Sequence, residues 1–222
     1  MQIAHDMEHA CPQAWLVNFT NPMVRICDAV ARYSSIPVVG LCHQIYMGYA
    51  MAAKALANDL GFKGADEFVS SHASPSYFGA QGKMMDQAIA RIDIQAAGLN
   101  HFTWMLALRD KGTGEDLYPL FAKRWAALDR TFEPLTRRVY DAFGLFPIPG
   151  DEHLCEYLPW LSDPVTRPWE KYDVSLYEFD LMDERRGHDH DEIAKMGSGQ
   201  MGIEHLRHAH SEGALEIIEN IA

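Results

Sequence analysis

The stretch WLVNFTNPMVRICDAVARYSSIPVVGLCH, residues 15–43, decides the fold. Residues 15–19 and 36–42 are short apolar runs that predict two buried strands. Between them, residues 22–33 carry apolar side chains at helical spacing, and an Ala- and Met-rich helix is predicted over 45–60. The order strand, helix, strand, helix favours a parallel sheet whose functional site lies at the carboxyl ends of the strands.

Three polar residues follow the predicted strands directly. Asn21 comes after the first strand, and Cys42 and His43 come after the second. The carboxyl ends of parallel strands meet at one edge of a sheet, so we expect these side chains to face a common site. Asn21 is also a typical helix cap, with Pro22 at the first helical position, and the two roles are compatible.

The composition excludes several classes of protein. With 222 residues, 48% of them hydrophobic, the chain can bury a substantial core. A net charge of −12 argues against nucleic acid or an anionic membrane as a partner. The four cysteines show no CxxC spacing, and no basic-then-apolar leader follows Met1, so a reducing cytoplasmic location is expected. No apolar run reaches the roughly 18 residues of a membrane span.

The remainder of the chain predicts a mixed α+β layer. Helical patterns, alternating runs and turn residues follow one another less regularly there. The predicted elements are a loop over Val69–Tyr77, a strand over Ala88–Ala97, an apolar run over Gly98–Leu108, a helix over Tyr118–Tyr140 interrupted near Pro134, turns over Gly144–Asp151, a solvated loop over Asp183–Gly199 and a helix over Ser211–Ala222.

Two motifs in the charged region are interpreted as chance matches to a dinucleotide-binding motif and to a metal site. Residues 197–202, GSGQMG, match the dinucleotide pattern G-x-G-x-x-G, but residues 189–196 before them are mostly charged instead of forming a buried strand. The run His188-Asp189-His190-Asp191 has the composition of a metal site, yet its spacing on a charged segment is more typical of a solvated run.

Two further segments carry chemistry-capable residues. Residues 98–104 read GLNHFTW, and residues 151–160 read DEHLCEYLPW. Taken alone, Cys42 and His101 have no local metal-site spacing, so a buried small hydrophobe and a core histidine remain open interpretations. The Asn18–Pro22 segment, the Val38–His43 segment and residues 98–104, in this order, resemble glycoside hydrolase family 4, whose members are glycosidases that use NAD and a divalent metal. Residues 151–160 are similar to a further segment of that family.

The resemblance assigns roles to individual residues. Cys42 and His101 would hold the metal, usually Mn²⁺, and Tyr157 would be the catalytic base. A tyrosine, with a reference pKa of about 10, acts as a base near neutrality only beside a cation. His43 would assist departure of the leaving group as an acid. Substrate contacts would come from Asn21, Asn100 and His153, whereas no NAD-binding residue is identified.

The reaction implied by the resemblance is hydrolysis without net redox change. Oxidation by NAD at C3 of the sugar acidifies the hydrogen at C2, a base removes it, and the group at C1 leaves by elimination. Histidine after the metal cysteine accompanies unphosphorylated α-glucosides, α-galactosides or α-uronides in the family. Gln44 replaces the usual serine after His43, so the sugar stays open. A 6-phosphoglycosidase, an NAD-dependent dehydrogenase on the same scaffold and an inactive metal-binding fragment are the alternatives.

The resemblance also implies a domain organisation. Residues 1–45 would be the last strands and helix of a Rossmann-type domain. Residues 46–222 would be an α+β lactate/malate-dehydrogenase-like domain for catalysis and oligomerisation, incomplete at its C-terminus. Family members carry a glycine-rich NAD motif in an N-terminal half, so this chain is expected to be a central fragment. The expected partners are a small carbohydrate and further copies of the chain in a homodimer or homotetramer.

Overall fold

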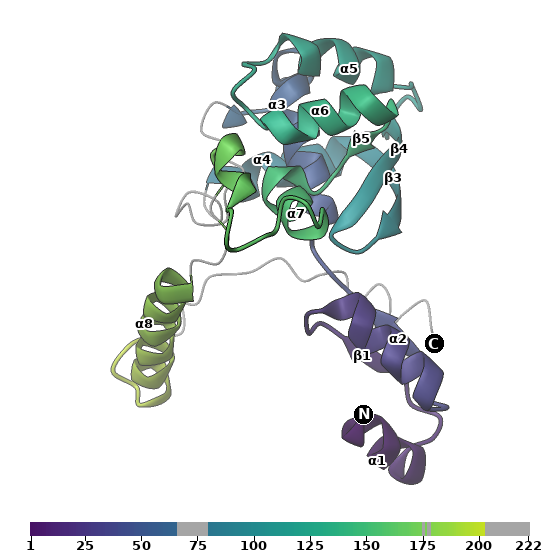
Figure 1. The fold of residues 1–222 in the computed structure, drawn as a ribbon, viewed down its shortest axis with the longest axis vertical. Coiled ribbons are helices and arrows are strands. Elements are labelled where there is room, and N and C mark those ends of the chain that lie inside the picture. The colour runs from purple at the N-terminus through teal and green to yellow at the C-terminus, as the bar shows by residue number, and fades with distance from the viewer. Residues whose placement is uncertain (66–79, 175, 177–178, 203–222) are drawn as a thin grey trace. The chain divides into compact units, whose positions relative to one another are not determined.

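The computed structural model describes residues 1–65, 80–174, 176 and 179–202 (Figure 1). The chain divides into two compact units, Met1–Val174 and Ser175–Ala222. The predicted loop at 69–77 and the predicted helix at 211–222 lie outside the described residues. The expected domain boundary near residue 45 stays a prediction.

The predicted strand, helix, strand, helix order is confirmed in the first unit. Strands β1 (Leu16–Asn18) and β2 (Val38–Gly40) form a parallel pair, connected by helix α2 (Met23–Tyr33). The strands are shorter than the apolar runs that predicted them. Helix α3 (Ile45–Leu60) follows over the predicted range. Both strands therefore end at the same edge, and Asn21 and Cys42 lie in the segments that follow them.

Helix α3 lies at the centre of the core. It packs against α4 (Ala80–Arg91) and α5 (Tyr118–Ala127). Its small alanines allow close approach of the neighbouring helices, while Met51 and Leu56 fill the remaining space and are fully buried. The rest of this core comes from the other helices and the second sheet, including Met84, Ile92, Met105, Leu108, Phe121, Trp125 and Phe146.

The second sheet has the order β3-β4-β5 and is antiparallel. Strands β3 (Ile92–Leu99) and β4 (Phe102–Asp110) form a hairpin, and the short β5 (Phe146–Pro147) pairs with β4. The prediction of a strand from Ala88 is wrong for its first residues, because α4 continues to Arg91. Met84 and Ala88 lie one helical turn apart on α4 and are both fully buried, which stabilises the helix there.

The helical region after the hairpin is interrupted as predicted. Helix α5 ends at Ala127, and α6 (Pro134–Phe143) begins at the predicted break. The turn-rich segment that follows contains β5 and the start of α7 (Gly150–Tyr157), and a 3₁₀ helix spans Pro168–Tyr172. Buried polar contacts join α6 to α7, because Asp151 accepts hydrogen bonds from the first amides of α6. This junction fixes the helix that carries His153 and Tyr157.

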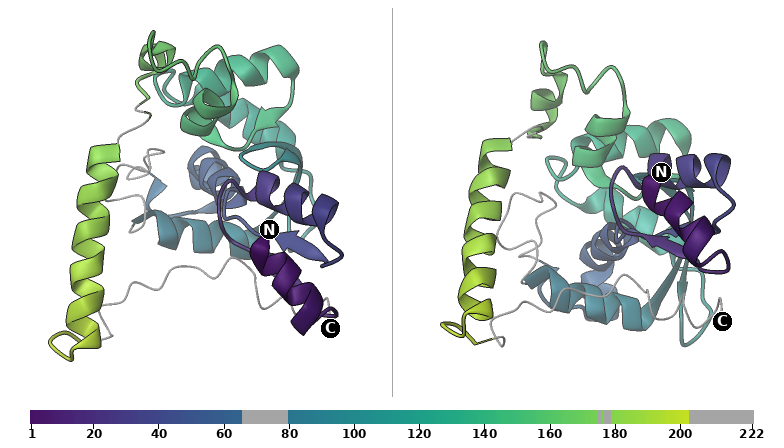
Figure 2. Two further views of the ribbon diagram at one scale, coloured as in Figure 1. Left: turned by 60° about the horizontal axis from the view of Figure 1, so that its bottom comes forward. Right: turned by 90° about the horizontal axis from the view of Figure 1, so that it is seen from below.

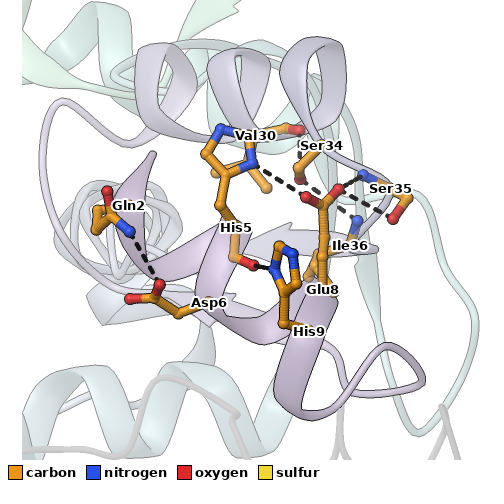
Figure 3. A network of polar contacts seen from close by, with 9 residues as sticks. All are labelled: Gln2, His5, Asp6, Glu8, His9, Val30, Ser34, Ser35 and Ile36. Atoms are coloured by element: carbon orange, nitrogen blue, oxygen red, sulfur yellow. Dashed lines mark hydrogen bonds and ion pairs between the residues drawn. The ribbon is translucent and has the colours of Figure 1, made fainter.

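An N-terminal helix, α1 (Gln2–Ala10), precedes β1 and was not predicted. Figure 3 shows Glu8 of α1 between His5 of the same helix and Ser35, which precedes β2. The Glu8 carboxylate accepts hydrogen bonds from the backbone amide of Ser35 at 2.6 Å and from its hydroxyl at 3.0 Å. The hydrogen bond with His5 and then these contacts with Ser35 lower the Glu8 pKa to about 2. The Ser35 contacts also fasten α1 to the segment before β2, 27 residues away along the chain.

The second unit contains helix α8 (Phe179–Gly197), which runs unbroken (Figure 2). The predicted solvated loop over Asp183–Gly199 is therefore wrong for most of its length. Helix-forming charged residues and local pairs such as Arg186 with Asp183, three residues apart, favour a helix without an apolar stripe. The motif at 197–202 follows the end of α8 instead of a strand. Among the described residues, none of the helices has the length and apolarity to cross a bilayer.

Candidate metal centre

The structure brings Cys42 and His101 together. Cys42 follows β2, and His101 lies in the two-residue turn between β3 and β4. The Cys42 Sγ atom is 3.2 Å from Nε2 of His101, although the two residues are 59 positions apart in the sequence. A thiolate and an imidazole that bind one ion at about 2.1–2.3 Å lie roughly 3–4 Å from each other. The two donors are spaced as ligands of one metal ion would be.

His101 adopts a left-handed backbone conformation, with φ at 65°. A side chain in this region costs of order 1 kcal/mol, and such strain is typical of functional positions. Gly98, three residues earlier, has φ at 143°, and a Cβ there would lie 2.5 Å from the carbonyl oxygen of Phe102. Only glycine fits this close approach, so Gly98 allows the turn that presents His101.

A second pair of side chains lies beside the first. Gln44 donates through Nε2 to the hydroxyl of Thr103 at 2.8 Å, and that hydroxyl lies 3.1 Å from Oε1 of Gln44. Gln44 is two residues after Cys42, and Thr103 is two residues after His101. This buried carboxamide therefore ties the two ligand-bearing segments together next to the proposed ligands.

Helix α7 supplies a third group of side chains. The His153 ring stacks on His101 with centroids 4.3 Å apart and an interplanar angle of 16°. Nδ1 of His153 is 2.6 Å from Oε2 of Glu156 on the same helix face. The Tyr157 ring stands edge-on to His101 at 6.0 Å between centroids. Three predicted site residues, His101, His153 and Tyr157, are thus brought together.

The electrostatic surroundings of Tyr157 oppose ionisation. Partial burial raises the pKa of Tyr157, and the carboxylate of Glu156 and the thiol of Cys42 raise it further. Arg25 of α2 acts in the other direction and lowers it. Tyr157 therefore needs additional positive charge to act as a base, which agrees with the expectation that a cation lies beside it.

The cysteines have different environments. Cys155 is fully buried, and burial together with the nearby carboxylates of Asp151 and Glu133 raises its pKa to about 12. Cys155 therefore stays protonated at neutral pH and is a poor metal ligand. Cys42 is partly exposed beside an imidazole, which is the setting in which a thiolate can bind a cation.

The other predicted site residues lie at the edges of this region. Asn21 is exposed after β1 and accepts a hydrogen bond from the Met23 amide at 3.3 Å, but it lies one residue before Pro22, which is the N-cap of α2, so the predicted helix-cap position is off by one residue. His43 is exposed in the turn before α3, next to Cys42. Asn100 precedes His101 in the hairpin turn. The structure places each beside a segment that carries a proposed ligand, and their roles stay predictions.

Sequence reasoning missed two charged residues of the site. Glu156 is three residues after His153 on α7, and this spacing on one helix face was the signal that could have revealed the pair. Arg25 acts on Tyr157 from α2, and a single arginine on a helix gives no such signal. Both residues show their proximity to the site only in the folded chain.

The residues present fit a divalent cation. One thiol, two imidazoles and a carboxylate are gathered at the meeting point of β2, the β3–β4 turn and α7. Borderline ions such as Co²⁺ and Zn²⁺ accept imidazole and thiolate, whereas Mn²⁺ is harder and binds such donors less tightly. A strained turn that carries a partly buried histidine is consistent with a site formed for binding instead of packing.

Comparisons with known proteins identify the family. The family described as "Family 4 glycosyl hydrolase" matches residues 1–58, and "Family 4 glycosyl hydrolase C-terminal domain" matches residues 96–222. The second match covers more than half of the chain. The chain belongs to glycoside hydrolase family 4.

Individual relatives place the chain within longer proteins. An α-galactosidase of Bacillus subtilis (strain 168) is 32% identical over 160 residues, which are 71% of this chain and 30% of the relative. The crystal structure of lplD from Bacillus subtilis matches with a TM-score of 0.70 at 22% identity, over 98% of this chain and 47% of that one. A 6-phospho-α-glucosidase from gut microorganisms, in complex with NAD and Mn²⁺, matches with a TM-score of 0.56 at 16% identity, over 97% of this chain and 44% of that one.

These comparisons confirm the predicted fold class. The chain is α/β, with a parallel strand pair followed by a mixed α+β region that contains an antiparallel sheet. The chain spans less than half the length of each of these relatives.

Proposed function

We propose that this chain is the metal-bearing part of a glycosidase that hydrolyses unphosphorylated α-glycosides with NAD and Mn²⁺ as cofactors. The observation that carries the proposal is the 3.2 Å approach of Cys42 Sγ to His101 Nε2, with Tyr157 beside them. The family and the solved relative in complex with NAD and Mn²⁺ support the choice of cofactors. A cytoplasmic homodimer or homotetramer is part of the proposal.

The chain's own residues have the following roles in the proposed reaction. When bound, the two cofactors supply Lewis acidity and a reversible hydride acceptor. Tyr157 accepts the proton from C2 of the sugar, and Arg25 favours its ionised form. His43 donates a proton to the leaving oxygen at C1. Asn21 and Asn100 donate to and accept from sugar hydroxyls, because a carboxamide can do both.

The substrate class is proposed from the residue after Cys42. His43 is typical of family members that act on unphosphorylated α-glycosides, and the Bacillus subtilis relative is called an α-galactosidase. The alternative is a 6-phosphoglycosidase, the activity named for one solved relative. The exposure of His43 next to Cys42 is compatible with contact to a sugar in either case.

The test is release of p-nitrophenol from α-glucoside, α-galactoside and α-galacturonide substrates and from their 6-phosphates. The chain is assayed with NAD⁺, Mn²⁺ and a thiol reductant, and then without each cofactor. We expect turnover only with both cofactors, on unphosphorylated sugars, and deuterium at C2 of the product when the reaction runs in D₂O. Net NADH formation would instead support a dehydrogenase. Mn²⁺ binding without turnover would support an inactive fragment.

A matched pair of variants tests the role of Tyr157. Tyr157→Phe removes the proposed base and should lower kcat by about a hundredfold or more. Tyr33→Phe, at an exposed tyrosine of α2, is the control and should leave kcat unchanged. Equal activities of the two variants would remove Tyr157 from the mechanism.

A further inference from the structure

An arginine without a partner lies beside the candidate metal centre. Arg25 is exposed on α2, four residues after Asn21, and its side chain makes no hydrogen bond or ion pair with any residue that the structure describes. Ion pairs with carboxylates are made instead by Arg32, Arg91, Arg124, Arg167 and Arg186. The chain has 31 acidic side chains and 19 Lys and Arg side chains, so partners for an arginine are plentiful. The free guanidinium of Arg25 therefore needs an explanation.

The stability of α2 does not explain Arg25. Asp28, three residues later on the same helix, pairs with Arg32, whose Nε lies 2.7 Å from Oδ1 of Asp28. The first turn of α2 contains Arg25 but no acidic residue. A positive side chain in the first turn lies near the positive end of the helix dipole, where it opposes helix formation instead of favouring it. We therefore look for the role of Arg25 outside α2.

Arg25 faces the residues of the candidate metal centre. Helix α2 begins at the edge of the parallel pair where Cys42 also lies, after β2. Arg25 lowers the pKa of Tyr157 and the thiol of Cys42 raises it, so both groups are close enough to act on this phenol. The Tyr157 ring, 41% of whose residue is exposed, stands 6.0 Å from that of His101. The guanidinium thus belongs to the same cluster of side chains.

A guanidinium at this place favours an anionic sugar. Its paired N–H groups match the two oxygens of a carboxylate, and an uncharged sugar offers no such group. One guanidinium balances the single charge of a carboxylate, whereas a phosphate group carries a charge of about −1.5 to −2. The net charge of the chain is −12, which repels an anion at long range. Binding of an anionic sugar to this chain therefore requires a local cation.

We propose that Arg25 binds the carboxylate at C6 of a sugar that lies against Tyr157, so that the substrates are α-uronides. The inference rests on the proposed function and narrows its substrate class. Arg25 then has two separable effects. It favours the ionised form of Tyr157 with every substrate, and it binds the carboxylate only when the substrate is a uronide.

The experiment compares sugars of the same configuration by binding calorimetry of the full chain with Mn²⁺ and NAD⁺. The probes are the methyl α-glycosides of galacturonic and glucuronic acid, their uncharged counterparts methyl α-galactoside and methyl α-glucoside, and the 6-phosphates of these two. With at least one configuration, the unmodified chain should bind the uronide about tenfold or more tighter than the uncharged sugar. Arg25→Gln should weaken uronide binding by about tenfold to a hundredfold and leave that of the uncharged sugar within about twofold.

Two further variants complete the set. Arg25→Lys keeps the charge without the paired N–H groups and should recover part of the uronide affinity. Arg130→Gln removes an exposed arginine outside the site and is the matched control. Circular dichroism of each variant reports whether the chain still folds.

NMR of the arginine Nε–H groups gives a residue-specific answer. The Arg25 signal, identified by its loss in Arg25→Gln, should shift when the bound uronide is added and should stay in place with the uncharged sugar. Equal binding of uronides and uncharged sugars by the unmodified chain, or equal losses for both in Arg25→Gln, would overturn the proposal. Tighter binding of the 6-phosphates would overturn it in favour of a phosphate. Failure of the proposed function has a different signature, since the unmodified chain would then bind no sugar of any class, and the proposal would fall with it.

Discussion

At the scale of single residues, backbone conformation decides where the side chain of His101, a proposed metal ligand, points. His101 has a left-handed φ of 65°, and Gly98 has a φ of 143° with no room for a Cβ. Both features set the position of the His101 imidazole. The strain they store is offset by the long β3–β4 pairing that flanks the turn.

Substitution of Gly98 tests this argument. Gly98→Ala places a Cβ against the Phe102 carbonyl oxygen, so the turn must move, and the free energy of unfolding should fall by about 1–3 kcal/mol. Co²⁺ affinity should fall as well, because His101 moves with the turn. Gly112→Ala, in the loop after β4, meets only the Asp110 side chain at 3.3 Å and is the control. Urea unfolding and Co²⁺ titration measure both effects, and identical behaviour of the two variants would contradict the account.

Gln44 is a positioning residue at the same scale. Its hydrogen bonds with Thr103 run beside the contact between Cys42 and His101. Gln44→Leu keeps the volume but removes the carboxamide, so Co²⁺ affinity should fall by about tenfold. Thr103→Val should have a similar effect, and the double variant should be no worse than either one. Additive losses measured in this cycle would show that the two residues act independently.

At the scale of elements, the junction of α6 and α7 positions the third group of site residues. Asp151 accepts hydrogen bonds from the Leu135 amide at 2.9 Å and from the Thr136 amide at 2.6 Å and hydroxyl at 2.7 Å. Glu133 accepts from the Asp151 amide at 2.6 Å. These buried contacts join the start of α7 to the start of α6, and α7 carries His153 and Tyr157.

Removal of this junction should affect both stability and the site. Asp151→Ala leaves the first amides of α6 without partners, so the free energy of unfolding should fall by about 2 kcal/mol or more. Asp163→Ala removes a similar cap from an exposed turn and should cost less than about 1 kcal/mol. Thermal unfolding followed by circular dichroism compares them. An equal loss of stability in both variants would show that the buried junction contributes no more to the free energy of unfolding than an exposed cap does.

The docking of α1 gives a pH dependence. The Glu8 pKa is lowered from 4.5 to about 2, first by its hydrogen bond with His5 and then by those with Ser35. Because the pKa is lower in the folded state, this contribution is fully present above pH 4.5 and is lost as the pH falls toward 2. The Ser35 amide resonance should therefore titrate with a midpoint near pH 2 and should not titrate in Glu8→Gln. A midpoint near 4.5 would contradict the hydrogen bond.

The sequence predicted elements with a clear apolar period and missed those without one. The strands β1 and β2 and the helices α2 and α3 were predictable because apolar residues recur in their sequences as short runs or at helical spacing. Helix α1 buries only Ala4, and the α8 side chains that the structure describes are not buried, so neither helix shows a buried apolar period in the described residues. Polar contacts such as that of Glu8 with Ser35 hold α1 instead. Contacts between distant segments leave no local pattern.

The same distinction applies to the site. Cys42, His101 and Tyr157 were selected through the resemblance to a family, and their proximity in the structure agrees with it. Their spacing in the sequence alone would not have joined them, because three separate elements carry them. The sequence motifs assign no role to Glu156 or Arg25. Only the folded chain shows that Glu156 contacts His153 and that Arg25 lowers the pKa of Tyr157.

At the scale of the whole molecule, a bound metal should stabilise the first unit. Cys42 follows the parallel pair and His101 lies in the antiparallel hairpin, so one ion would link two sheets that are far apart in the sequence. An ion that binds only the folded state, at a hundred times its Kd, adds about 2.7 kcal/mol. For a chain of this size, that corresponds to a rise in Tm of about 5–10 °C.

Scanning calorimetry with and without Mn²⁺ measures this linkage. The unmodified chain should show the rise in Tm, and a chelator should reverse it. Cys42→Ser should show almost none, whereas Cys11→Ser, at an exposed cysteine outside the site, should behave like the unmodified chain. A rise that persists in Cys42→Ser would mean that the stabilising ion binds elsewhere.

The most direct test of the central claim is a crystal structure of the chain grown with Mn²⁺, with anomalous diffraction recorded at the manganese absorption edge. The account predicts one strong anomalous peak within bonding distance of Cys42 Sγ and His101 Nε2. A chain with no peak there, or with its manganese bound only to the histidines of α8, would contradict it.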